Sequence, residues 1–229
     1  MLALSRAQVR EVDRVAMDEY SVPGIVLMEN AGRNASEAIV RLFDSISDQD
    51  VVVVAGHGNN GGDGLVIARY LELAGAKVQV VLAASPQRFE GDSLANLEII
   101  NRSGIDQVCL AGAAIEQWQN ALSSATCVID AILGTGATGV ARGDSKVAIE
   151  SILGRMKMDS RPSVISIDVP SGFDCDRGVP CGPCVCADET LTFVALKQGF
   201  KAIDAEHYTG RIHVLDIGVP LVVRNRFGL

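Results

Sequence analysis

The sequence predicts a three-layer α/β/α fold with a mostly parallel sheet and an N-terminal helical extension. Three observations support this prediction. Short runs of β-branched residues alternate with amphipathic segments, several of the runs are apolar at every position, and two helical segments precede the first long strand. Strands that are apolar throughout are typical of a sheet with helices on both faces. The expected layout is therefore Rossmann-like.

Seven strands are expected, each a short run rich in Val, Ile or Thr that turn residues follow. The first of them, VVVVA, has no polar position at all. Strands that alternate with helical segments predict βαβ units, in which successive strands run parallel. The expected strands are residues 51–55, 77–83, 107–110, 126–130, 163–168, 189–194 and 211–215.

Four segments carry apolar residues at spacings of three and four, which places those residues on one face of a helix. Ser5 and Gln8 form a capping-box pattern that predicts the start of the first helix. Gly75 predicts the end of the third helix. The four stripes are Val9, Val12, Ala16 and Tyr20; Ala31, Ala35, Ala38, Ile39 and Leu42; Leu65, Ala68 and Leu71; and Ala148, Ile149, Ile152, Leu153 and Met156.

The bulk properties bound the class of protein. The 229 residues contain no internal repeat and no Pro-rich linker, so a single domain over residues 1–229 is expected. A net charge of −8 without a cluster of Lys and Arg argues against nucleic-acid binding. No apolar run approaches the roughly 20 residues of a membrane span, and the N-terminus lacks the pattern of a secretory signal. We therefore expect a cytoplasmic protein that makes no membrane contact.

Four of the six cysteines lie close together, at Cys175, Cys181, Cys184 and Cys186. Stable disulfides are not expected in a cytoplasmic chain. Cys181 and Cys184 form a C-x-x-C pair, which raises the alternative of a zinc site. The usual second pair is missing, so small residues in a turn-rich loop are the favoured interpretation.

A glycine-rich loop, GHGNNGGDG over residues 56–64, joins the first expected strand to a helix expected to start near Asp63. Gly56, Gly58 and Gly61 satisfy the G-x-G-x-x-G pattern in its strand-loop-helix context. We predict that these glycines adopt positive φ and that main-chain N–H groups bind a phosphate. The alternative is a glycine-rich turn without a ligand.

An ordinary NAD-dependent dehydrogenase carries an acidic residue at the end of its second strand, where it binds the ribose. In this chain residues 81–85 read VLAAS and contain no carboxylate. Ser85 and Arg88 are the polar residues available for a ribose or its phosphate. The sequence therefore favours phosphate binding in a manner different from that of the dehydrogenases.

Two further expected strands end in an aspartate, Asp130 and Asp168, each followed by a glycine-containing turn. The carboxyl ends of parallel strands share one edge of a sheet, so both side chains are expected to face the crevice beside the glycine loop. Partial burial at the end of a strand can raise the pKa of a carboxyl group, as proton transfer requires. A helix-capping or turn-forming role is the alternative for either residue. Lys197 is expected either to reach an anionic ligand or to be solvated.

The chain resembles the NAD(P)HX epimerase family, also called the YjeF N-terminal domain. The resemblance runs from about Ser5 to Pro220, and the cysteine-rich loop 175–186 departs from the family pattern. The segments that carry it are LMENAGR (27–33), GNNGGDGLVIARYL (58–71), DAILGTGATG (130–139), SIDVPSGFD (166–174) and ADETLTFVALKQG (187–199).

The resemblance implies a Rossmann-like homodimer that converts the R epimer of hydrated NADH or NADPH (NADHX or NADPHX) into the S epimer. It also implies a partner, an ATP- or ADP-dependent dehydratase, expected on a separate polypeptide because this chain ends at Leu229. One potassium ion per subunit is expected on Asn60, Asp130 and Ser171. The residues expected to line the substrate are Asn59, Asn60, Gly61, Gly62, Asp63, Gly134, Thr135, Gly136, Ala137, Thr138, Gly139, Val140 and Asp168.

Asp168 is the expected catalytic residue. The ring nitrogen can expel the hydroxyl of the substrate, and water can return on the other face, with Asp168 as acid and base. Ring opening to an aldehyde and reclosure is the alternative route. A non-catalytic nucleotide-binding scaffold of the same fold, an NAD-dependent oxidoreductase and a zinc-binding module are the competing functions. The sequence does not decide between NADHX and NADPHX.

Overall fold

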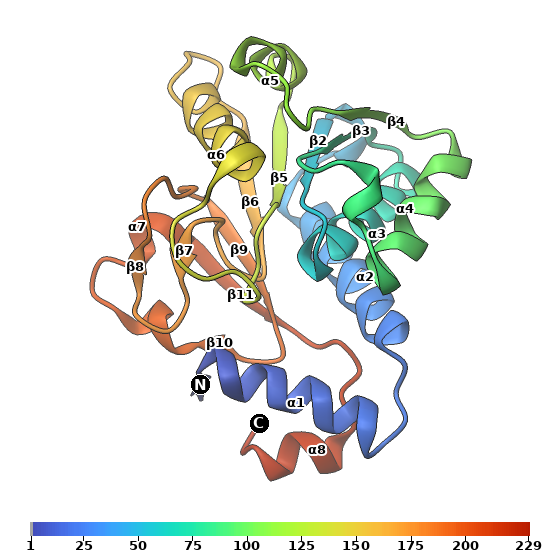
Figure 1. Ribbon diagram of the computed structural model, residues 1–229, viewed down its shortest axis with the longest axis vertical. Coiled ribbons are helices and arrows are strands. Elements are labelled where there is room, and N and C mark those ends of the chain that lie inside the picture. Colours follow the sequence, from blue (N-terminus) through green and yellow to red (C-terminus); the bar gives the residue numbers. More distant parts are fainter. Residues whose placement is uncertain (1) are drawn as a thin grey trace.

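Seven parallel strands form the central sheet, which the computed structural model shows in the order β11-β9-β6-β5-β2-β3-β4 (Figure 1). The model describes residues 2–229. All seven expected strands are confirmed, with ends shifted by at most one residue. Their bounds are β2 Asp50–Ala55, β3 Lys77–Leu82, β4 Asp106–Cys109, β5 Cys127–Ala131, β6 Ser163–Ile167, β9 Glu189–Phe193 and β11 Arg211–Leu215.

The central strand β2 shows why apolar runs form this sheet. Val51 and Val53 belong to one apolar core, whereas Val52 and Val54 belong to a second core on the opposite face. Successive side chains of a strand point to opposite faces, so a strand buried on both sides needs an apolar residue at every position. The VVVVA run meets this requirement.

Helices cover both faces of the sheet. The helices α2 (Gly24–Leu42), α3 (Asn59–Leu73) and α4 (Gly91–Ser103) pack on one face, and α5 (Ile115–Leu122) and α6 (Gly143–Arg155) pack on the other. The three-layer α/β/α prediction is therefore confirmed. The expected stripes identified α2, α3 and α6 but did not include α4 or α5. The shorter helices are η1 Ile46–Asp48, η2 Pro86–Arg88, η3 Gln198–Lys201, α7 Glu206–Thr209 and α8 Leu221–Arg226.

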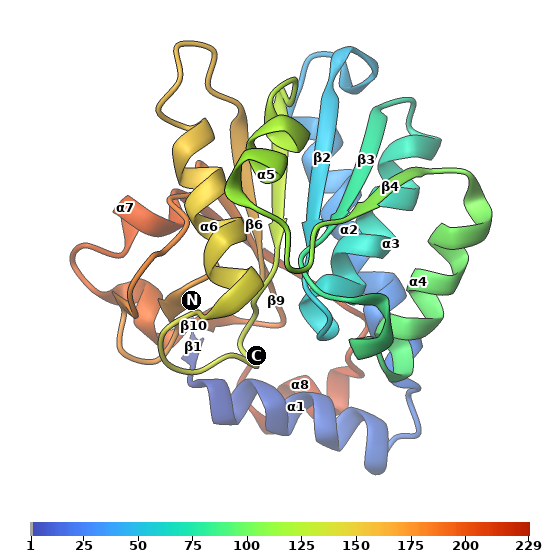
Figure 2. The same ribbon diagram turned by 45° about the horizontal axis from the view of Figure 1, so that its top comes forward.

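The first helix, α1 (Arg6–Asp18), lies beyond the carboxyl ends of the strands, beside α8 (Figure 2). The capping box of Ser5 and Gln8 is present as predicted. The expected stripe is confirmed at Val9, Val12 and Ala16, whereas Tyr20 follows the helix and is exposed. Helix α1 is the N-terminal extension, and it covers the edge of the sheet where a ligand is expected.

Two small sheets hold peripheral segments in place. The strand β1 (Ala3–Leu4) pairs with β10 (Leu196–Lys197), which fixes the N-terminus beside the end of β9. The strand β7 (Phe173–Asp174) pairs with β8 (Val179–Pro180) in a hairpin. Two residues per strand are too few for a pattern of alternation, so the sequence did not reveal these sheets.

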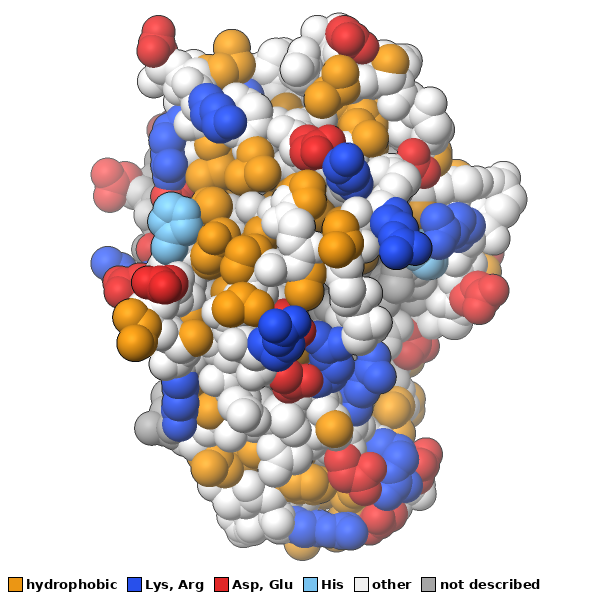
Figure 3. Space-filling view, turned by 60° about the vertical axis from the view of Figure 1, so that its left-hand side comes forward, with side chains coloured by type: hydrophobic (Ala, Val, Ile, Leu, Met, Phe, Trp, Pro, Cys, Tyr) orange, Lys and Arg blue, Asp and Glu red, His pale blue; other side chains and the backbone are white. Residues whose placement is uncertain are grey.

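The cysteine-rich segment 175–186 surrounds this hairpin. Cys175 and Cys184 are buried in a small apolar cluster with Phe173 and Phe200. Residues 2–229 contain no group of three or more His, Cys, Asp or Glu side chains placed to hold a metal ion. Figure 3, which views the side of the molecule with β7, β8 and α7, shows hydrophobic side chains gathered on this face. None of the helices described has the length and apolar character required to cross a membrane.

The strand order reverses between β2 and β5. From β2 the chain moves outward through β3 and β4, and it then returns to β5 on the other side of β2. In open parallel sheets the loops that follow the two strands at such a reversal enclose the ligand-binding crevice. The glycine loop follows β2 and the loop 132–142 follows β5, so the topology brings both to this point.

Candidate active site

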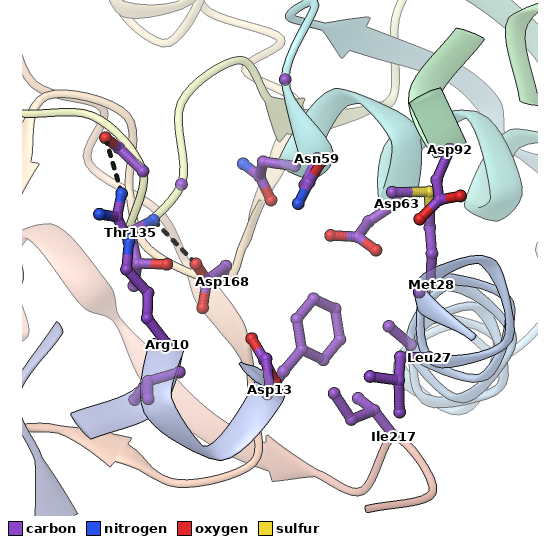
Figure 4. Close-up of a pocket in the computed structure, with 18 of the residues that line it drawn as sticks. Arg10, Asp13, Leu27, Met28, Asn59, Asp63, Asp92, Thr135, Asp168 and Ile217 are labelled. Atoms are coloured by element: carbon purple, nitrogen blue, oxygen red, sulfur yellow. Dashed lines mark hydrogen bonds between the residues drawn. The ribbon is translucent and has the colours of Figure 1, made fainter. Parts of the chain in front are cut away.

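A cavity of about 500 Å³ opens at the reversal point, between the carboxyl ends of the strands and helix α1 (Figure 4). Its walls come from α1, α2, the start of α3 and the segments that follow β5, β6 and β9. The polar residues of the lining are Arg10, Asp13, His57, Asn59, Asn60, Asp63, Asp92, Thr135 and Asp168. Leu27, Met28, Phe193 and Ile217 are among its apolar residues.

The glycine loop is shorter than predicted. Helix α3 begins at Asn59, with Gly58 as its N-cap, rather than near Asp63. None of the glycines at 56, 58, 61, 62 and 64 has a positive φ, so this part of the prediction was wrong. The N–H groups of the first turn of a helix have no partners within that helix, and here they belong to residues 59–61. Asn59 and Asn60 of this turn line the cavity.

Close packing explains why glycine occupies most of these positions. A Cβ atom on Gly56 would overlap the carbonyl oxygen of Ile132, and a Cβ atom on Gly61 would overlap the carbonyl oxygen of Gly56. A Cβ atom on Gly64 would lie 2.5 Å from the Cβ atom of Ala131. Only Gly58 of the five has open space around it. The glycines thus let α3 start directly against the ends of β2 and β5, which presents its N-terminus to the cavity.

Asp168 lies at the centre of the cavity wall, directly after β6. Its Oδ1 atom is 2.9 Å from Nζ of Lys197, and its Oδ2 atom accepts a hydrogen bond of 2.9 Å from the N–H of Thr135. Burial alone would raise the pKa of Asp168, but Lys197 and Thr135 outweigh it and hold the pKa below 3.8. The side chain is therefore an ionised carboxylate with both oxygens fixed.

The backbone at this position is strained. Asp168 has a φ of 65° and Val194, which follows β9, has a φ of 68°. Such values cost about 1–3 kcal/mol in residues other than glycine, and they persist where the surrounding contacts hold them. The N–H groups of Asp168 and Val194 bond to Leu191 and Leu215 of the adjacent strands. The strain turns both residues out of their strands and into the cavity lining.

Lys197 is neither solvated nor at the cavity surface. It is 0% exposed, and its ammonium group also donates hydrogen bonds to the carbonyl oxygens of Phe193 and Ala195. A buried ammonium requires a compensating charge, which Asp168 supplies. Both alternatives expected for this lysine were therefore wrong. Its partner lies on another strand, so spacing along the chain gave no signal.

Two more carboxyl groups line the same cavity. Asp13 lies on α1, and its Oδ1 atom is buried without a hydrogen-bond partner among the described residues. Burial and the charge of Asp168 raise the pKa of Asp13 to about 6. Burial, Asp168 and Asp13 raise the pKa of Asp63 well above 3.8. Sequence reasoning missed Asp13, although an acid four residues after Val9 and three before Ala16 lies on the apolar face of the helix.

Asp130 lies behind the cavity wall rather than in it, contrary to the expectation that it faces the crevice. It is 0% exposed, and its Oδ2 atom accepts hydrogen bonds of 2.8 Å from Ser166 Oγ and from the N–H of Ser171. Its Oδ1 atom accepts one of 2.5 Å from Ser171 Oγ, which in turn accepts from the N–H of Leu133. Asp130 therefore ties the loop after β5 to the loop after β6.

Asn60 has an unusual environment for a buried amide. It is 7% exposed, and neither its Oδ1 nor its Nδ2 atom has a hydrogen-bond partner among residues 2–229. An orphaned buried polar group costs about 1–3 kcal/mol. Gly134 lies beside it, since a Cβ atom there would be 3.0 Å from the Asn60 Cβ atom and from Asp168 Oδ2. The free amide oxygen is suited to an additional ligand or ion.

The loop after β5 contributes its first half to the cavity. Gly134, Thr135, Gly136 and Ala137 line it, whereas the expected Thr138, Gly139 and Val140 follow outside the lining. Gly61 and Gly62 pack inside the first turns of α3 and are likewise absent from the lining. Whether these residues contact a ligand stays a prediction.

Arg10 is a second residue that sequence reasoning missed. It projects from α1, lines the cavity, and its Nη2 atom donates a hydrogen bond of 3.3 Å to the carbonyl oxygen of Gly136. It is the only Lys or Arg residue in the cavity lining of the described chain. A guanidinium group at the mouth of the cavity is suited to an anionic ligand.

Residues 24–199 match the family model described as YjeF-related protein N-terminus. The chain belongs to the YjeF N-terminal family. The matched part contains the glycine loop, Asp130, Asp168 and Lys197 but not α1, which supplies Arg10 and Asp13. The family match therefore contains the cavity lining except for the residues of α1 and Ile217.

Curated relatives resemble the chain along nearly its whole length. An NAD(P)H-hydrate epimerase of Rhodopirellula baltica is 38% identical over 97% of this chain and 86% of its own length. One of Pirellula staleyi is 41% identical over 94% of this chain and 92% of its own. A bifunctional NAD(P)H-hydrate repair enzyme of Moorella thermoacetica is 39% identical over 96% of this chain but only 41% of its own length.

A solved structure agrees with the fold. The crystal structure of yeast YNL200c superposes with a TM-score of 0.82 at 25% sequence identity and covers 100% of this chain and 94% of its own. The agreement includes the N-terminal extension, because the whole chain is covered.

Proposed function

We propose that the protein is an NAD(P)H-hydrate epimerase, which interconverts the R and S epimers of NADHX and NADPHX. The fixed carboxylate of Asp168, held by Lys197 and Thr135 in the wall of the cavity, is the observation that carries this proposal. Relatives with this name that match nearly the whole chain support it. A non-catalytic scaffold has no need of a buried lysine that positions a strained aspartate.

Main-chain amides and one guanidinium group bind the diphosphate of the substrate in this proposal. The first-turn N–H groups of α3 at Asn59 and Asn60, two residues that line the cavity, suit an anion. Arg10 adds a charge-assisted donor from the opposite wall. The amides carry most of the binding, which is consistent with a chain whose net charge is −8.

The chemistry inverts one saturated carbon next to the ring nitrogen of the nicotinamide. The nitrogen lone pair expels the hydroxyl, which leaves as water once it is protonated, and the ring becomes a planar cation. Water then adds to the other face and loses a proton. The carboxylate of Asp168 stabilises the cation and accepts that proton. Ring opening to an aldehyde and reclosure is an alternative that needs the same proton transfers.

A potassium ion bound by Asn60, Asp130 and Ser171 is part of the proposal. The free amide oxygen of Asn60, the carboxylate of Asp130 and the hydroxyl of Ser171 are oxygen donors of the kind that hard cations prefer. When bound, the ion supplies positive charge near the diphosphate. Asp130 and Ser171 already join the two neighbouring loops, so they would hold the ion where those loops meet.

We further propose that the protein acts in the cytoplasm as a homodimer, together with a separate NAD(P)HX dehydratase. The relative of M. thermoacetica, of which this chain spans 41%, is named a bifunctional repair enzyme, which supports a second activity in the same repair process. The exposed Val179 of β8 and the exposed Val140, which lies beside Gly182, supply apolar surface for a subunit interface.

A coupled assay tests the function. Loss of the R epimer is followed by chromatography while a purified dehydratase removes the S epimer, and the spontaneous epimerisation rate is subtracted. We expect the protein to accelerate the loss, and Asp168→Asn to bind the substrate but turn over at least about a hundredfold more slowly. The proposed function is rejected if the wild-type protein adds nothing to the spontaneous rate. Near-normal turnover of Asp168→Asn rejects the role of Asp168.

A further inference from the structure

We propose that Asp63 is the proton donor of the reaction and acts across the cavity from Asp168. The inference rests on the proposed function and divides the acid and base roles between two residues. The proton of Asp63 passes to the departing hydroxyl as the C–O bond breaks and the ring nitrogen supplies the electrons. Asp168 then takes a proton from the water that adds to the other face, and exchange with solvent resets the pair.

Asp168 is poorly placed to be the donor. Both of its oxygens already accept hydrogen bonds, one from the Lys197 ammonium group and one from the N–H of Thr135. Lys197 keeps Asp168 ionised at the start of the cycle, so Asp168 has no proton to give, whereas the second lone pair of each oxygen leaves it able to accept one. The group that protonates the departing hydroxyl is therefore a different one.

Asp63 has the opposite environment. It is 9% exposed and lies in the second turn of α3. Neither a hydrogen bond nor a cation stabilises the ionised form of its carboxyl group. Burial and the neighbouring carboxylates of Asp168 and Asp13 raise its pKa well above 3.8. A neutral carboxyl group that faces a cavity is a hydrogen-bond and proton donor.

The sheet sets the separation of the two carboxyl groups. Asp168 follows β6 and Asp63 lies on the helix that follows β2, with β5 between these strands. The carboxyl ends of β2 and β6, from which the two residues are reached, are two strand spacings, or about 10 Å, apart. Figure 4 shows Asp63 and Asp168 on opposite sides of the cavity, with Asp13 on α1 between them. A planar ring fits between the two groups with one carboxyl group on each face, as inversion at one carbon requires.

The other ionisable residues of the lining suit the role less well. Asp13, from α1, faces both Asp63 and Asp168, and Asp92 approaches from the start of α4. His57 lies beside Arg88, and burial and that guanidinium lower the pKa of His57. Asp13 lies on neither face of a ring held between α3 and the end of β6. Asp63 is therefore the donor that the geometry favours.

Paired substitutions test the proposal. Asp63→Asn keeps the shape and a hydrogen-bond donor but has no proton to transfer. We expect its kcat to fall at least about a hundredfold while KM changes less than about threefold. In the wild type kcat falls as the pH rises and Asp63 ionises, and this decline is absent from the residual activity of Asp63→Asn. Asp159→Asn, at an exposed loop position, is the matched control and keeps wild-type kinetics.

A measurement independent of activity separates this proposal from the proposed function. Protein labelled with ¹³C at the aspartate carboxyl carbons gives a signal that is assigned to Asp63 by its loss in Asp63→Asn. We expect that signal to report a neutral carboxyl group at pH 7. An ionised Asp63 at pH 7, or kcat of Asp63→Asn within about threefold of wild type, overturns the proposal. An inactive wild type with a neutral Asp63 would instead reject only the proposed function.

Discussion

The ammonium group of Lys197 lies 2.9 Å from the carboxylate of Asp168, and the two residues follow neighbouring strands of the sheet. Lys197 is 0% exposed and Asp168 is 8% exposed, so water screens the pair little. Leu4 of β1 pairs with Lys197 of β10, so the backbone of Lys197 is held by a second small sheet. This ion pair fixes the position and the ionisation of the carboxylate together.

Replacement of Lys197 by methionine removes the charge from this pair. We expect the free energy of unfolding to fall by about 3–5 kcal/mol, because the carboxylate of Asp168 is left buried without a partner. The pKa of Asp168 rises in this variant, so activity shifts to higher pH. Urea denaturation and a pH–rate profile measure the two effects. Lys201→Met, at an exposed position, is the control, and a Lys197→Met variant as stable as this control would contradict the prediction.

Asp13 makes stability depend on pH in the opposite sense from a salt-bridged acid. Its pKa is 3.8 when unfolded and about 6 when folded, so between these values the folded state holds a proton that the unfolded state has lost. The contribution of Asp13 to the free energy of unfolding is therefore fully present below pH 3.8 and is lost as the pH rises through about 6. We expect Asp13→Asn to be more stable than wild type at pH 7.5, by at most about 3 kcal/mol.

The same variant is expected to match the wild type near pH 4, where Asp13 is protonated in the folded state. Urea denaturation at both pH values measures the difference. Asp63 has a raised pKa as well, so Asp13→Asn removes only part of the wild-type decline. A stability difference that does not change between pH 4 and 7.5 would show that Asp13 is not the source.

The glycine loop allows packing to be separated from ligand binding. Gly61→Ala places a Cβ atom against the Gly56 carbonyl oxygen, which is backbone and cannot move aside, so we expect a loss of at least about 2 kcal/mol. Gly58→Ala meets open space and changes only the N-cap, so its cost is below about 1 kcal/mol. Thermal unfolding measures both. Equal losses in the two variants would refute the packing explanation.

Arg10→Ala tests the guanidinium group at the cavity mouth. Loss of a charge-assisted contact to a phosphate should raise KM about tenfold and leave kcat nearly unchanged. The effect should shrink as the salt concentration rises, because salt screens an exposed charge. Steady-state kinetics at two ionic strengths measure it. Arg102→Ala, on the exposed side of α4, serves as the control, and an equal KM change there would argue against a specific contact.

Potassium binding is testable without the reaction. We expect a higher melting temperature in potassium chloride than in tetramethylammonium chloride at the same ionic strength, because an ion that binds only the folded state stabilises it. Asn60→Ala removes the free amide oxygen and should abolish this difference. The same melting temperature in both salts for the wild type would refute the site.

The sequence was sufficient to predict the strands of the sheet but not the side-chain contacts of the site. Strands such as β2 are apolar at every position because both faces are buried, and that pattern needs no knowledge of neighbours. The same parallel topology predicted that Asp168 and the N-terminus of α3 lie at the carboxyl ends of the strands. Asp130 also follows a strand, but its side chain turns toward Ser166 and Ser171, which no local pattern indicates.

Two residues act through partners distant in the sequence: Lys197, whose surroundings were predicted wrongly, and Arg10, which was missed. Lys197 becomes intelligible only when the end of β10 is placed beside Asp168, and Arg10 only when α1 is placed beside the loop after β5. The glycines showed a different weakness of pattern matching. The G-x-G-x-x-G motif marked the correct position, but steric exclusion by backbone atoms, rather than positive φ, explains why glycine occupies it.

The attachment of α1 has a consequence for how the protein is made. The N–H of Arg6 bonds to Asp176, and Glu19 pairs with Arg226, so contacts across 170 and 207 residues hold this helix in place. Both partners leave the ribosome long after α1 does. A nascent chain can therefore complete β2 and α3 early but cannot close the wall that carries Asp13 until Arg226 has been added.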